Sequence, residues 1–410
     1  MLAIDHPVHQ NGGRSGDRPS SDTDDMRLLH TSDWHVGKSI RGHSRADEHR
    51  AVLADVASAA ADEAVDLIVV AGDLYETAAP SAESETIVNQ ALLDLAEVAP
   101  VVAVAGNHDN PRRLAAVAPL LRLGRITMAT TPRSPSDGGV VTIDAGDVQV
   151  DVALVPFVSQ RGIVRAVDLM DNAAFENAQS YAERLNRILG VLSDGFRADR
   201  VNLIVGHLFV HGGSTGGGER QAHLVDEYGI SAVDFPTTAA YVALGHLHRP
   251  QQIPGPTAIH YCGSPLQLDF GETEQIKQVN IVDLEPGLPA KVRPRTISAG
   301  RPLRTLRGTL ADVTAQIEGL GPDELERGWF RVRLDEPSRS GLAEEVRAMI
   351  GPTVVDIRVE HTDTPKPRPT RTERTPRELF ADYLAERGVH DPAVERRFAE
   401  LHDELSDGAR

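Results

Sequence analysis

The chain has 410 residues, of which 40% are hydrophobic and 25% are charged, as in globular proteins with more than one domain. This composition excludes collagen-like, coiled-coil and wholly disordered chains, and no run of about 18 uncharged apolar residues could span a membrane. The net charge of −18 argues against a protein that coats nucleic acid with a basic surface, but it is compatible with a local phosphate site.

The N-terminal segment differs in composition from the rest of the chain. Residues 1–25 contain much Gly, Ser, Asp and Pro without an apolar repeat, so we interpret them as a disordered extension. Met26 directly precedes the first predicted strand and is a candidate for the true start. The N-terminus lacks the pattern of a signal peptide, and the single cysteine, Cys262, permits no internal disulfide. We therefore expect a cytoplasmic protein that does not bind membranes.

Short apolar runs alternate with helical patterns from residue 26 onward. Strands are predicted at residues 27–31, 66–71, 101–105, 148–155, 201–205 and 241–244, and helices at 47–63, 83–97 and 173–192. The run at 101–105 is wholly apolar, as expected for a strand of a sheet that is covered on both faces. The pattern predicts an α/β layered domain over residues 26–290.

The sequence changes character near residue 290. The segment from Pro286 to Pro294 interrupts the alternation, and residues 291–371 contain 15 basic and 12 acidic residues, a net charge of +3. We predict a smaller α+β domain at 295–360. Its expected strands are residues 303–307, 329–334 and 354–359, and its expected helices are 310–320 and 342–350.

The sequence of the C-terminal part predicts a tether followed by two short helices. Residues 361–371 are rich in proline and predict a stiff linker. Thr375-Pro376 and Asp391-Pro392 are typical helix starts within residues 372–405. The predicted helices carry two apolar stripes: Leu379, Phe380, Tyr383 and Leu384, and Val394, Phe398, Leu401 and Leu405. The stripes either pack on the body of the chain or dock onto another protein, and the tether favours docking.

Five segments with aspartate, asparagine or histidine directly follow apolar runs. They are Asp33-Trp34-His35, Gly72-Asp73, Gly106-Asn107-His108-Asp109, Gly206-His207 and Gly245-His246-Leu247-His248. A lone histidine is more often a hydrogen-bonded structural residue than a ligand. The carboxyl ends of strands, however, form the ligand-binding edge of α/β sheets, so five such segments predict one shared site.

The residue types in these segments favour metal-assisted hydrolysis of a phosphodiester. Oxygen and imidazole ligands without thiolates suit two divalent ions such as Mn²⁺, with Fe²⁺ or Zn²⁺ as competitors. Asp73 is the expected bridge between the two ions, which would make the pocket positive and attractive to phosphate. His108 is expected to donate the proton to the leaving oxygen, with Asp109 orienting its imidazole by a hydrogen bond.

The five segments, in this order, resemble the calcineurin-like metallophosphoesterase superfamily. The opening Leu28-Leu-His-Thr-Ser-Asp-Trp-His35 and the run Leu244-Gly-His-Leu-His-Arg-Pro250 are similar to its DNA nuclease members. The resemblance implies a catalytic role for His108. It also implies one metal on Asp33, His35, Asp73 and His248, and a second on Asp73, Asn107, His207 and His246.

The resemblance extends to the other segments of the chain. It implies a DNA-facing cap at 295–360 and a helix-loop-helix at 372–405 that binds the coiled-coil base of an ATPase. It also implies a homodimer, formed by helices near 39–50 and 77–95, within a heterotetramer. Glu76 stands where archaeal and eukaryotic members carry histidine, whereas bacterial members often have an acid. The glycine-rich loop at 212–218 is either a flexible surface loop or a lid.

The expected activity is that of a metal-dependent double-strand exonuclease and single-strand or hairpin endonuclease in DNA repair and recombination. A small-nucleotide phosphodiesterase would use the same metal ligands, but it would need neither the cap nor the tethered helices. A non-catalytic scaffold for the ATPase would not need the complete ligand set with His108. Both alternatives stay open at this point.

Overall fold

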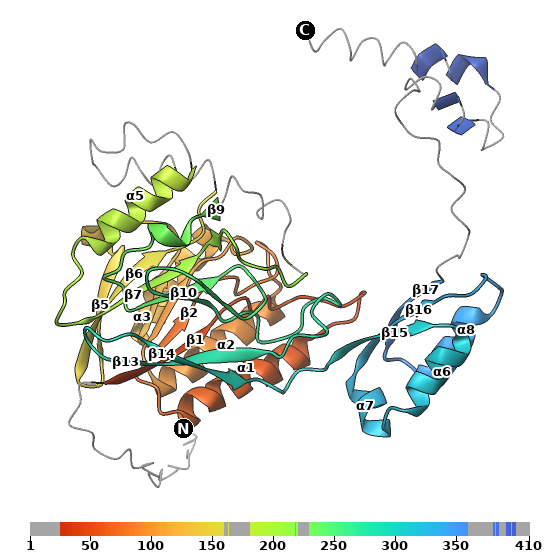
Figure 1. Cartoon of the computed structure of the whole chain (residues 1–410), viewed down its shortest axis with the longest axis horizontal. Helices are drawn as coiled ribbons and strands as arrows, with labels where there is room; N and C mark the ends of the chain where they lie inside the picture. The colour runs from red at the N-terminus through yellow and green to blue at the C-terminus, as the bar shows by residue number, and fades with distance from the viewer. Residues whose placement is uncertain are drawn as a thin grey trace, which may run out of the picture.

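A computed structural model shows a large body with a smaller unit beside it (Figure 1). It describes residues 25–159, 163, 181–217, 219, 229–359, 380, 381, 383, 384, 391–394 and 396–398. In these ranges the body contains two six-stranded sheets, and the smaller unit contains one three-stranded sheet. None of the described helices is both long enough and apolar enough to cross a membrane.

The first sheet has the strand order β14-β13-β1-β2-β3-β4. Its parallel strands are β1 (Met26–Thr31), β2 (Leu67–Val70), β3 (Val101–Val104) and β4 (Ile126–Ala129), and β13 (Gln278–Leu284) and β14 (Lys291–Thr296) extend it antiparallel. Helices α1 (Ala46–Asp62), α2 (Ala82–Val98) and α3 (Pro111–Leu123) connect the parallel strands. Apolar residues of α1 and α2, such as Val56 and Leu92, pack with Ile68 and Val101 and cover one face of this sheet.

The second sheet has the order β11-β12-β10-β7-β6-β5. Its strands are β5 (Val140–Ala145), β6 (Val148–Val155), β7 (Val201–His207), β10 (Tyr241–Gly245), β11 (Gln251–Ile253) and β12 (Ala258–Tyr261). Helix α5 (Tyr181–Ser193) covers its outer face, where Leu185 and Ile188 pack against Ile204 and Val242. Short elements complete the body: β8 (Phe209–Val210), β9 (Gly229–Ile230), η1 (Pro135–Asp137) and η5 (Ala232–Asp234).

The two sheets pack against each other through a second layer of apolar side chains. Leu67, Val69 and Val102 of the first sheet share this core with Val150 and Leu203 of the second. Helices therefore cover the outer faces, and the inner faces are buried against each other. Burial on both faces explains why the central strands are apolar throughout. The body is the predicted α/β layered domain, and the carboxyl ends of β1, β2, β3, β7 and β10 meet at one edge.

The smaller unit follows the body in sequence. Its parallel strands are β15 (Leu303–Gly308), β16 (Trp329–Leu334) and β17 (Val354–Val359), and its helices are α6 (Leu310–Glu318), α7 (Pro322–Arg327) and α8 (Leu342–Ile350). Phe330 and Val332 face the helices and pack against Val313 and Val346. Because side chains alternate along a strand, Arg331 lies on the opposite face of the sheet.

The segment around residue 290 does not end the body, contrary to our expectation from its prolines. Residues 285–290 form the turn between β13 and β14, and β14 pairs with β13 from Lys291 to Thr296. Pro294 is tolerated because β14 is an edge strand, where one backbone N–H need not bond within the sheet. The body thus extends to residue 296. The predicted linker and residues 173–180 of the predicted helix 173–192 lie outside the described residues.

Candidate metal centre

The structure brings together all seven side chains that we predicted as metal ligands. Imidazole nitrogens of His35 and His248 and a carboxylate oxygen of Asp33 lie within 4.8 Å of one another, as do atoms of Asp33, Asp73 and His207. Asp73 Oδ2 lies 3.5 Å from His35 Nε2 and 3.4 Å from His207 Nε2. The carboxylate of Asp73 therefore lies between His35 and His207, and Asp33 belongs to both groups.

Asn107 and His246 complete the second group. The Oδ1 atom of Asn107 lies 2.8 Å from Nε2 of His207 and 2.9 Å from Nδ1 of His246. His207 donates through Nδ1 to the carbonyl oxygen of Ala71 at 2.8 Å, because a carbonyl can only accept. Nε2 of His207 is then the ring atom that lies toward the oxygens of Asn107 and Asp73.

The backbone at this edge is held in an unusual conformation. Four of the seven residues have a positive φ: Asp33 (54°), His35 (47°), Asp73 (52°) and His246 (101°). Residues other than glycine rarely adopt such angles, which cluster at functional sites where the surrounding structure enforces them. Glycines allow the close approach: a Cβ on Gly106 would collide with the Asp73 carboxylate, and one on Gly245 with the carbonyl of Ala71.

Two histidines in this site point one ring nitrogen each at the other across a short distance. Nε2 of His35 lies 3.1 Å from Nε2 of His248. The Nδ1 atoms of these rings lie 3.0 Å from the carboxylates of Glu76 and Glu272, respectively. A carboxylate accepts the Nδ1 hydrogen, so in the neutral state each ring directs a lone pair at the other across 3.1 Å, unless a proton lies between them. Burial lowers the pKa of His248, but the hydrogen bond and charge of Glu272 raise it above its usual value. A divalent ion bound by both nitrogens would remove the repulsion between the lone pairs, so the donor set fits a metal.

The carboxylates behind the two histidines are ionised. Burial raises the pKa of Glu76, but the hydrogen bond and charge of His35, with Lys38, lower it to about 2. Burial likewise raises the pKa of Glu272, but His248 and Lys277 lower it to about 2. Each imidazole is therefore backed by an anion, which strengthens it as a ligand.

Asp73 and His207 stabilise each other's charged forms. Burial raises the pKa of Asp73, but the charges of His207 and His35 hold it well below its usual value. Burial lowers the pKa of His207, but the charge of Asp73 raises it to about 9. A proton and a divalent cation compete for the same lone pair, so metal binding should release protons and weaken as the pH falls.

His108 lies beside the first group of ligands. Its ring centroid is 4.6 Å from that of His35, and its Nδ1 atom donates to the carbonyl oxygen of Glu76 at 2.7 Å. This hydrogen bond fixes the tautomer, so Nε2 is the ring atom that can take up or release a proton. The backbone N–H of His108 also donates to Oδ1 of Asp73 at 2.8 Å. His108 thus lies next to the predicted metal ligands His35 and Asp73.

The hydrogen bond that we predicted between Asp109 and the imidazole of His108 is wrong. Its carboxylate accepts hydrogen bonds from the backbone N–H groups of Leu74 (3.3 Å), Tyr75 (3.0 Å) and Gly106 (2.8 Å). The Nδ1 atom of His108 bonds to the main chain instead. Asp109 therefore joins the loop after β2 to the loop after β3. Burial, with the charge of Asp73, raises the pKa of Asp109 to about 6.

Sequence reasoning missed several residues that support the ligands. Ser32 donates to Oδ2 of Asp33 at 2.6 Å, and Glu272 with Lys277 supports His248. Glu219 accepts from the backbone N–H of His248 at 3.0 Å and also binds backbone N–H groups of the glycine-rich loop. No apolar period or dipeptide marks Glu219, Glu272 or Lys277, which lie in irregular loops.

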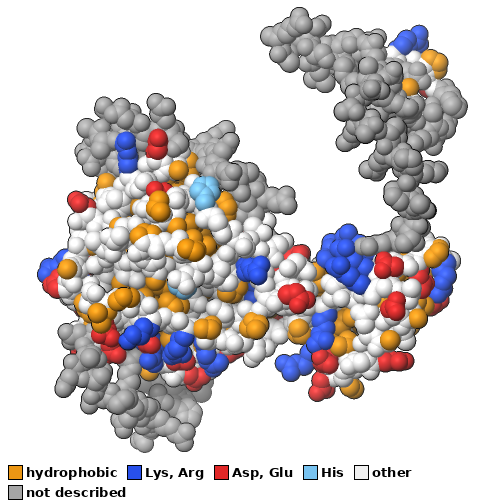
Figure 2. All heavy atoms as spheres, in the orientation of Figure 1, with side chains coloured by type: hydrophobic (Ala, Val, Ile, Leu, Met, Phe, Trp, Pro, Cys, Tyr) orange, Lys and Arg blue, Asp and Glu red, His pale blue; other side chains and the backbone are white. Residues whose placement is uncertain are grey.

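The smaller unit, or cap (residues 303–359), carries a basic surface on the open face of its sheet. Figure 2 shows basic side chains, all of them arginines in this range, gathered on the part of the cap next to β16 and β17. Arg331 lies over the ring of Phe270, 4.2 Å from its centroid, and Arg41 of the body lies 3.1 Å from Asp356. Arg358 on β17 is about half exposed. Arg331 of the cap and Arg41 of the body therefore meet at Asp356, and Arg358 pairs with the same carboxylate.

The layered body with a dinuclear set of N and O ligands defines a calcineurin-like phosphoesterase, and the sequence model of that family matches residues 26–250. Residues 299–387 match the family described as the type 5 capsule protein repressor C-terminal domain. Several relatives meet or exceed 30% identity over more than two thirds of both chains. The chain therefore belongs to the family of the D subunit of the nuclease SbcCD.

Three relatives show the extent of this similarity. The D subunit of the Bacillus subtilis nuclease SbcCD is 35% identical, over 68% of this chain and 71% of the relative. The Rhodobacter capsulatus protein of the same name is 32% identical, over 76% of this chain and 81% of the relative. The Escherichia coli protein is 30% identical, over 72% of this chain and 74% of the relative.

Proposed function

We propose that this chain hydrolyses phosphodiester bonds of DNA with two divalent metal ions, as the nuclease subunit of a complex with an SbcC-type ATPase. The observation that carries the proposal is the pair of facing Nε2 atoms of His35 and His248, each ring backed by an ionised carboxylate. Such a pair needs a proton or a metal ion between its nitrogens, and the carboxylates behind the rings suit it to hold a metal ion. The bridging position of Asp73 extends the site to a second ion.

Each ion would have its own ligand group. Asp33, His35, Asp73 and His248 would hold one ion, and Asp73, Asn107, His207 and His246 would hold the other. Oxygen and imidazole ligands without a thiolate favour Mn²⁺, with Fe²⁺ or Zn²⁺ as competitors. When bound, the two ions supply activation of the attacking water and neutralisation of the phosphate charge.

The remaining requirement is a proton for the leaving 3′ or 5′ oxygen. We assign it to Nε2 of His108, because the Glu76 carbonyl holds Nδ1 at 2.7 Å and so fixes the ring. A positioned general acid of this kind typically contributes about 10²-fold to 10⁴-fold to the rate. Asp109 acts on the metal ligands rather than on the proton, since its carboxylate joins the loops that carry Asp73 and Asn107.

DNA is a better substrate for this chain than a small nucleotide. A small phosphodiester would need only the metal centre, whereas the open face of the cap sheet carries Arg331, which contacts Phe270 of the body, and the half-exposed Arg358. Arginine side chains on one face are the usual means of holding a phosphate backbone. The whole chain carries a net charge of −18, so contact with DNA would depend on this local surface.

The partner surfaces follow from exposed apolar residues. Leu93 on α2 and Leu120 and Leu123 on α3 are 45%, 68% and 86% exposed, which supports a homodimer through α2 and α3. The resemblance implies helices near 39–50 and 77–95; Leu93 lies in the second of these segments, and α3 adds the two other exposed leucines. Residues 372–405 would bind the ATPase in a cytoplasmic heterotetramer. The rings of Phe380 and Phe398 stack 3.9 Å apart, so the two predicted helices contact each other.

A substrate comparison tests the proposal directly. Purified protein, with and without an SbcC-type ATPase, is incubated in Mn²⁺ with a labelled hairpin duplex and with a cyclic nucleotide. We expect Mn²⁺-dependent cutting of the DNA, stimulated by ATP when the ATPase is present. Hydrolysis of the cyclic nucleotide alone would identify a small-nucleotide phosphodiesterase. Failure to hydrolyse either substrate, with an intact complex, would identify a scaffold.

A further inference from the structure

The loop between β12 and β13 contains an ion pair that is almost fully buried. The Glu272 side chain is 0% exposed and that of Lys277 is 5% exposed, and Nζ of Lys277 lies 2.7 Å from Oε2 of Glu272. Oε1 of Glu272 accepts from Nδ1 of His248 at 3.0 Å. Lys277 also donates to the carbonyl oxygen of His248 at 3.2 Å. The pair therefore holds both the ring and the backbone of a predicted metal ligand.

The same loop is tied to the cap by the side chain of Gln267. Its amide nitrogen is within hydrogen-bonding distance of the carbonyl oxygens of Glu272 (3.1 Å), Thr273 (3.2 Å) and Gln275 (3.2 Å). Its Oε1 atom accepts from the backbone N–H of Leu303, the first residue of β15, at 2.8 Å. One amide thus connects the turn that contains Glu272 to the first strand of the cap.

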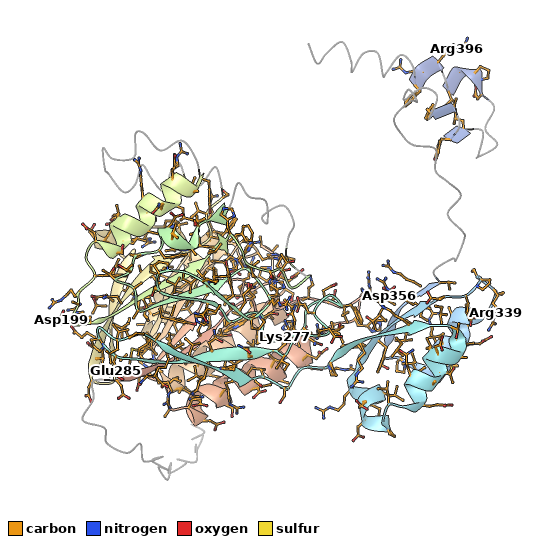
Figure 3. The ribbon with its side chains drawn as sticks, viewed as in Figure 1. Asp199, Lys277, Glu285, Arg339, Asp356 and Arg396 are labelled. Atoms are coloured by element: carbon orange, nitrogen blue, oxygen red, sulfur yellow. The ribbon has the colours of Figure 1, made fainter. Side chains whose placement is uncertain are left out.

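Apolar contacts add to this connection. Phe270 of the loop packs with Ile40 of the body and with Leu303 and Trp329 of the cap. Arg331 of the cap covers the Phe270 ring. The loop is therefore held between the metal centre and the cap, and Lys277 lies on the side of the body that faces the cap (Figure 3).

A second buried ion pair fixes the same junction. Arg45 binds the Glu48 carboxylate at 2.7 Å and donates to the carbonyl oxygen of Gln267. Glu48 also accepts from the indole N–H of Trp329 at 2.8 Å. The start of α1, the loop and β16 therefore share one hydrogen-bonded network. A cavity of about 390 Å³ borders this junction, lined by Leu266 and Gln267 of the loop and by Arg301.

We propose that Glu272 is a positioning residue for the metal ligand His248, and that its loop makes metal binding depend on the docking of the cap. The inference rests on the proposed function only in taking His248 as a metal ligand. A cap held by Gln267 and Trp329 keeps the Glu272 carboxylate behind the imidazole. A displaced cap would withdraw the loop and weaken the hold on His248.

Mn²⁺ affinity of the full chain, measured by isothermal titration calorimetry, tests the first part. We expect Glu272→Gln to weaken Mn²⁺ binding by about tenfold or more, as substitutions behind a metal ligand commonly do. Glu274→Gln is the matched control, because it makes the same change on an exposed residue of the same loop. Equal affinities of the two variants would overturn the role of Glu272.

Loss of one charge could instead unfold the loop, because Lys277 would remain buried without its partner. The double variant E272Q/K277M removes both charges, and we expect it to keep a cooperative thermal unfolding transition and still bind Mn²⁺ weakly. Restoration of wild-type affinity in this double variant would show that Glu272 only neutralises Lys277, which overturns the positioning role.

Gln267→Ala and Trp329→Phe test the coupling to the cap. Neither residue contacts a metal ligand, and we expect each to weaken Mn²⁺ binding by about threefold to tenfold, the usual range for residues that couple two sites. Arg339→Ala, at the far end of the cap in Figure 3, should have no effect. Wild-type affinity in both junction variants would overturn the coupling. A wild-type chain that binds Mn²⁺ but leaves DNA intact would overturn the proposed function alone.

Discussion

The edge of the body and the cap use charge in opposite ways. At the edge, Asp33 and Asp73 are buried and have strained backbone angles. In the described part of the cap, residues 303–359, positive φ angles occur at glycines only, and ion pairs such as Arg339–Glu345 are exposed. Strain and buried charge are retained where chemistry requires them. Substitutions at the edge should therefore affect catalysis, and those of exposed arginines in the cap should affect DNA affinity.

The largest effect is expected for Asp73→Asn. The bridging carboxylate would hold both ions, so its loss should abolish hydrolysis at any Mn²⁺ concentration, whereas His35→Ala removes a ligand of only one ion. Rates of cleavage over a Mn²⁺ titration check this order. Millimolar Mn²⁺ that restores Asp73→Asn but not His35→Ala would contradict the bridging assignment.

Truncation after Thr370 separates both regions from the segment predicted to bind the ATPase. All seven predicted ligands lie between Asp33 and His248, so the shortened chain should keep Mn²⁺-dependent hydrolysis of an activated phosphodiester. It should lose stable association with the ATPase, because apolar anchors at an interface commonly contribute about 2 kcal/mol or more each. Co-purification of the truncated chain with the ATPase, or its unfolding, would favour packing of the two helices on the body.

His108→Ala should reduce cleavage by about 10² or more while leaving metal content nearly unchanged. The reason is that Nδ1 of His108 is fixed on the Glu76 carbonyl, which leaves Nε2 for proton transfer. Metal content is measured by atomic emission on the purified variant. Fewer than two ions per chain would show that His108 holds the site together rather than donating a proton.

A smaller effect is expected in the cap from Arg358→Ala. If Arg358 contacts a phosphate, its loss should weaken DNA binding and reduce the slope of log affinity against log salt by about 1. Hydrolysis of a small activated phosphodiester should not change. Arg339→Ala is the matched control, since its side chain is similarly exposed but lies at the far end of the cap (Figure 3). The same salt slope in all three proteins would exclude a DNA contact by Arg358.

The smallest effect concerns stability rather than activity. Burial, with the charge of Arg45, lowers the pKa of His49 from 6.5 to about 3. The unfolded chain therefore binds a proton more readily, and the contribution of His49 to stability is lost as the pH falls from about 6.5 to about 3. At pH 5 this loss is about 2 kcal/mol. Urea unfolding in EDTA should show a smaller drop between pH 7 and pH 5 for His49→Asn.

The sequence allows the ligands to be predicted, but not the groups that hold them. Asp33, Asp73 and His207 each follow an apolar strand, so strand order alone brings them to one edge. Glu272 and Lys277 lie in an irregular loop without a period, and their burial depends on the packing of the cap. The partner of Asp109 could not be predicted, since three backbone N–H groups from two loops compete for its carboxylate.

The packing of the two sheets against each other could likewise not be predicted from the sequence pattern. An apolar run such as residues 101–104 indicates a strand covered on both faces, but it does not distinguish a helix from a second sheet as the cover. Edge strands such as β14 are harder to recognise, because their half-exposed residues give only a weak alternation.

The central claim is that two metal ions share Asp73 at this edge of the body. The most direct test is a crystal structure of the full chain grown with Mn²⁺, with anomalous scattering recorded at the manganese edge. The account predicts two peaks within coordination distance of Asp73, one beside His35 and His248 and the other beside His207 and His246. A single peak, or two peaks that do not share Asp73, would contradict it.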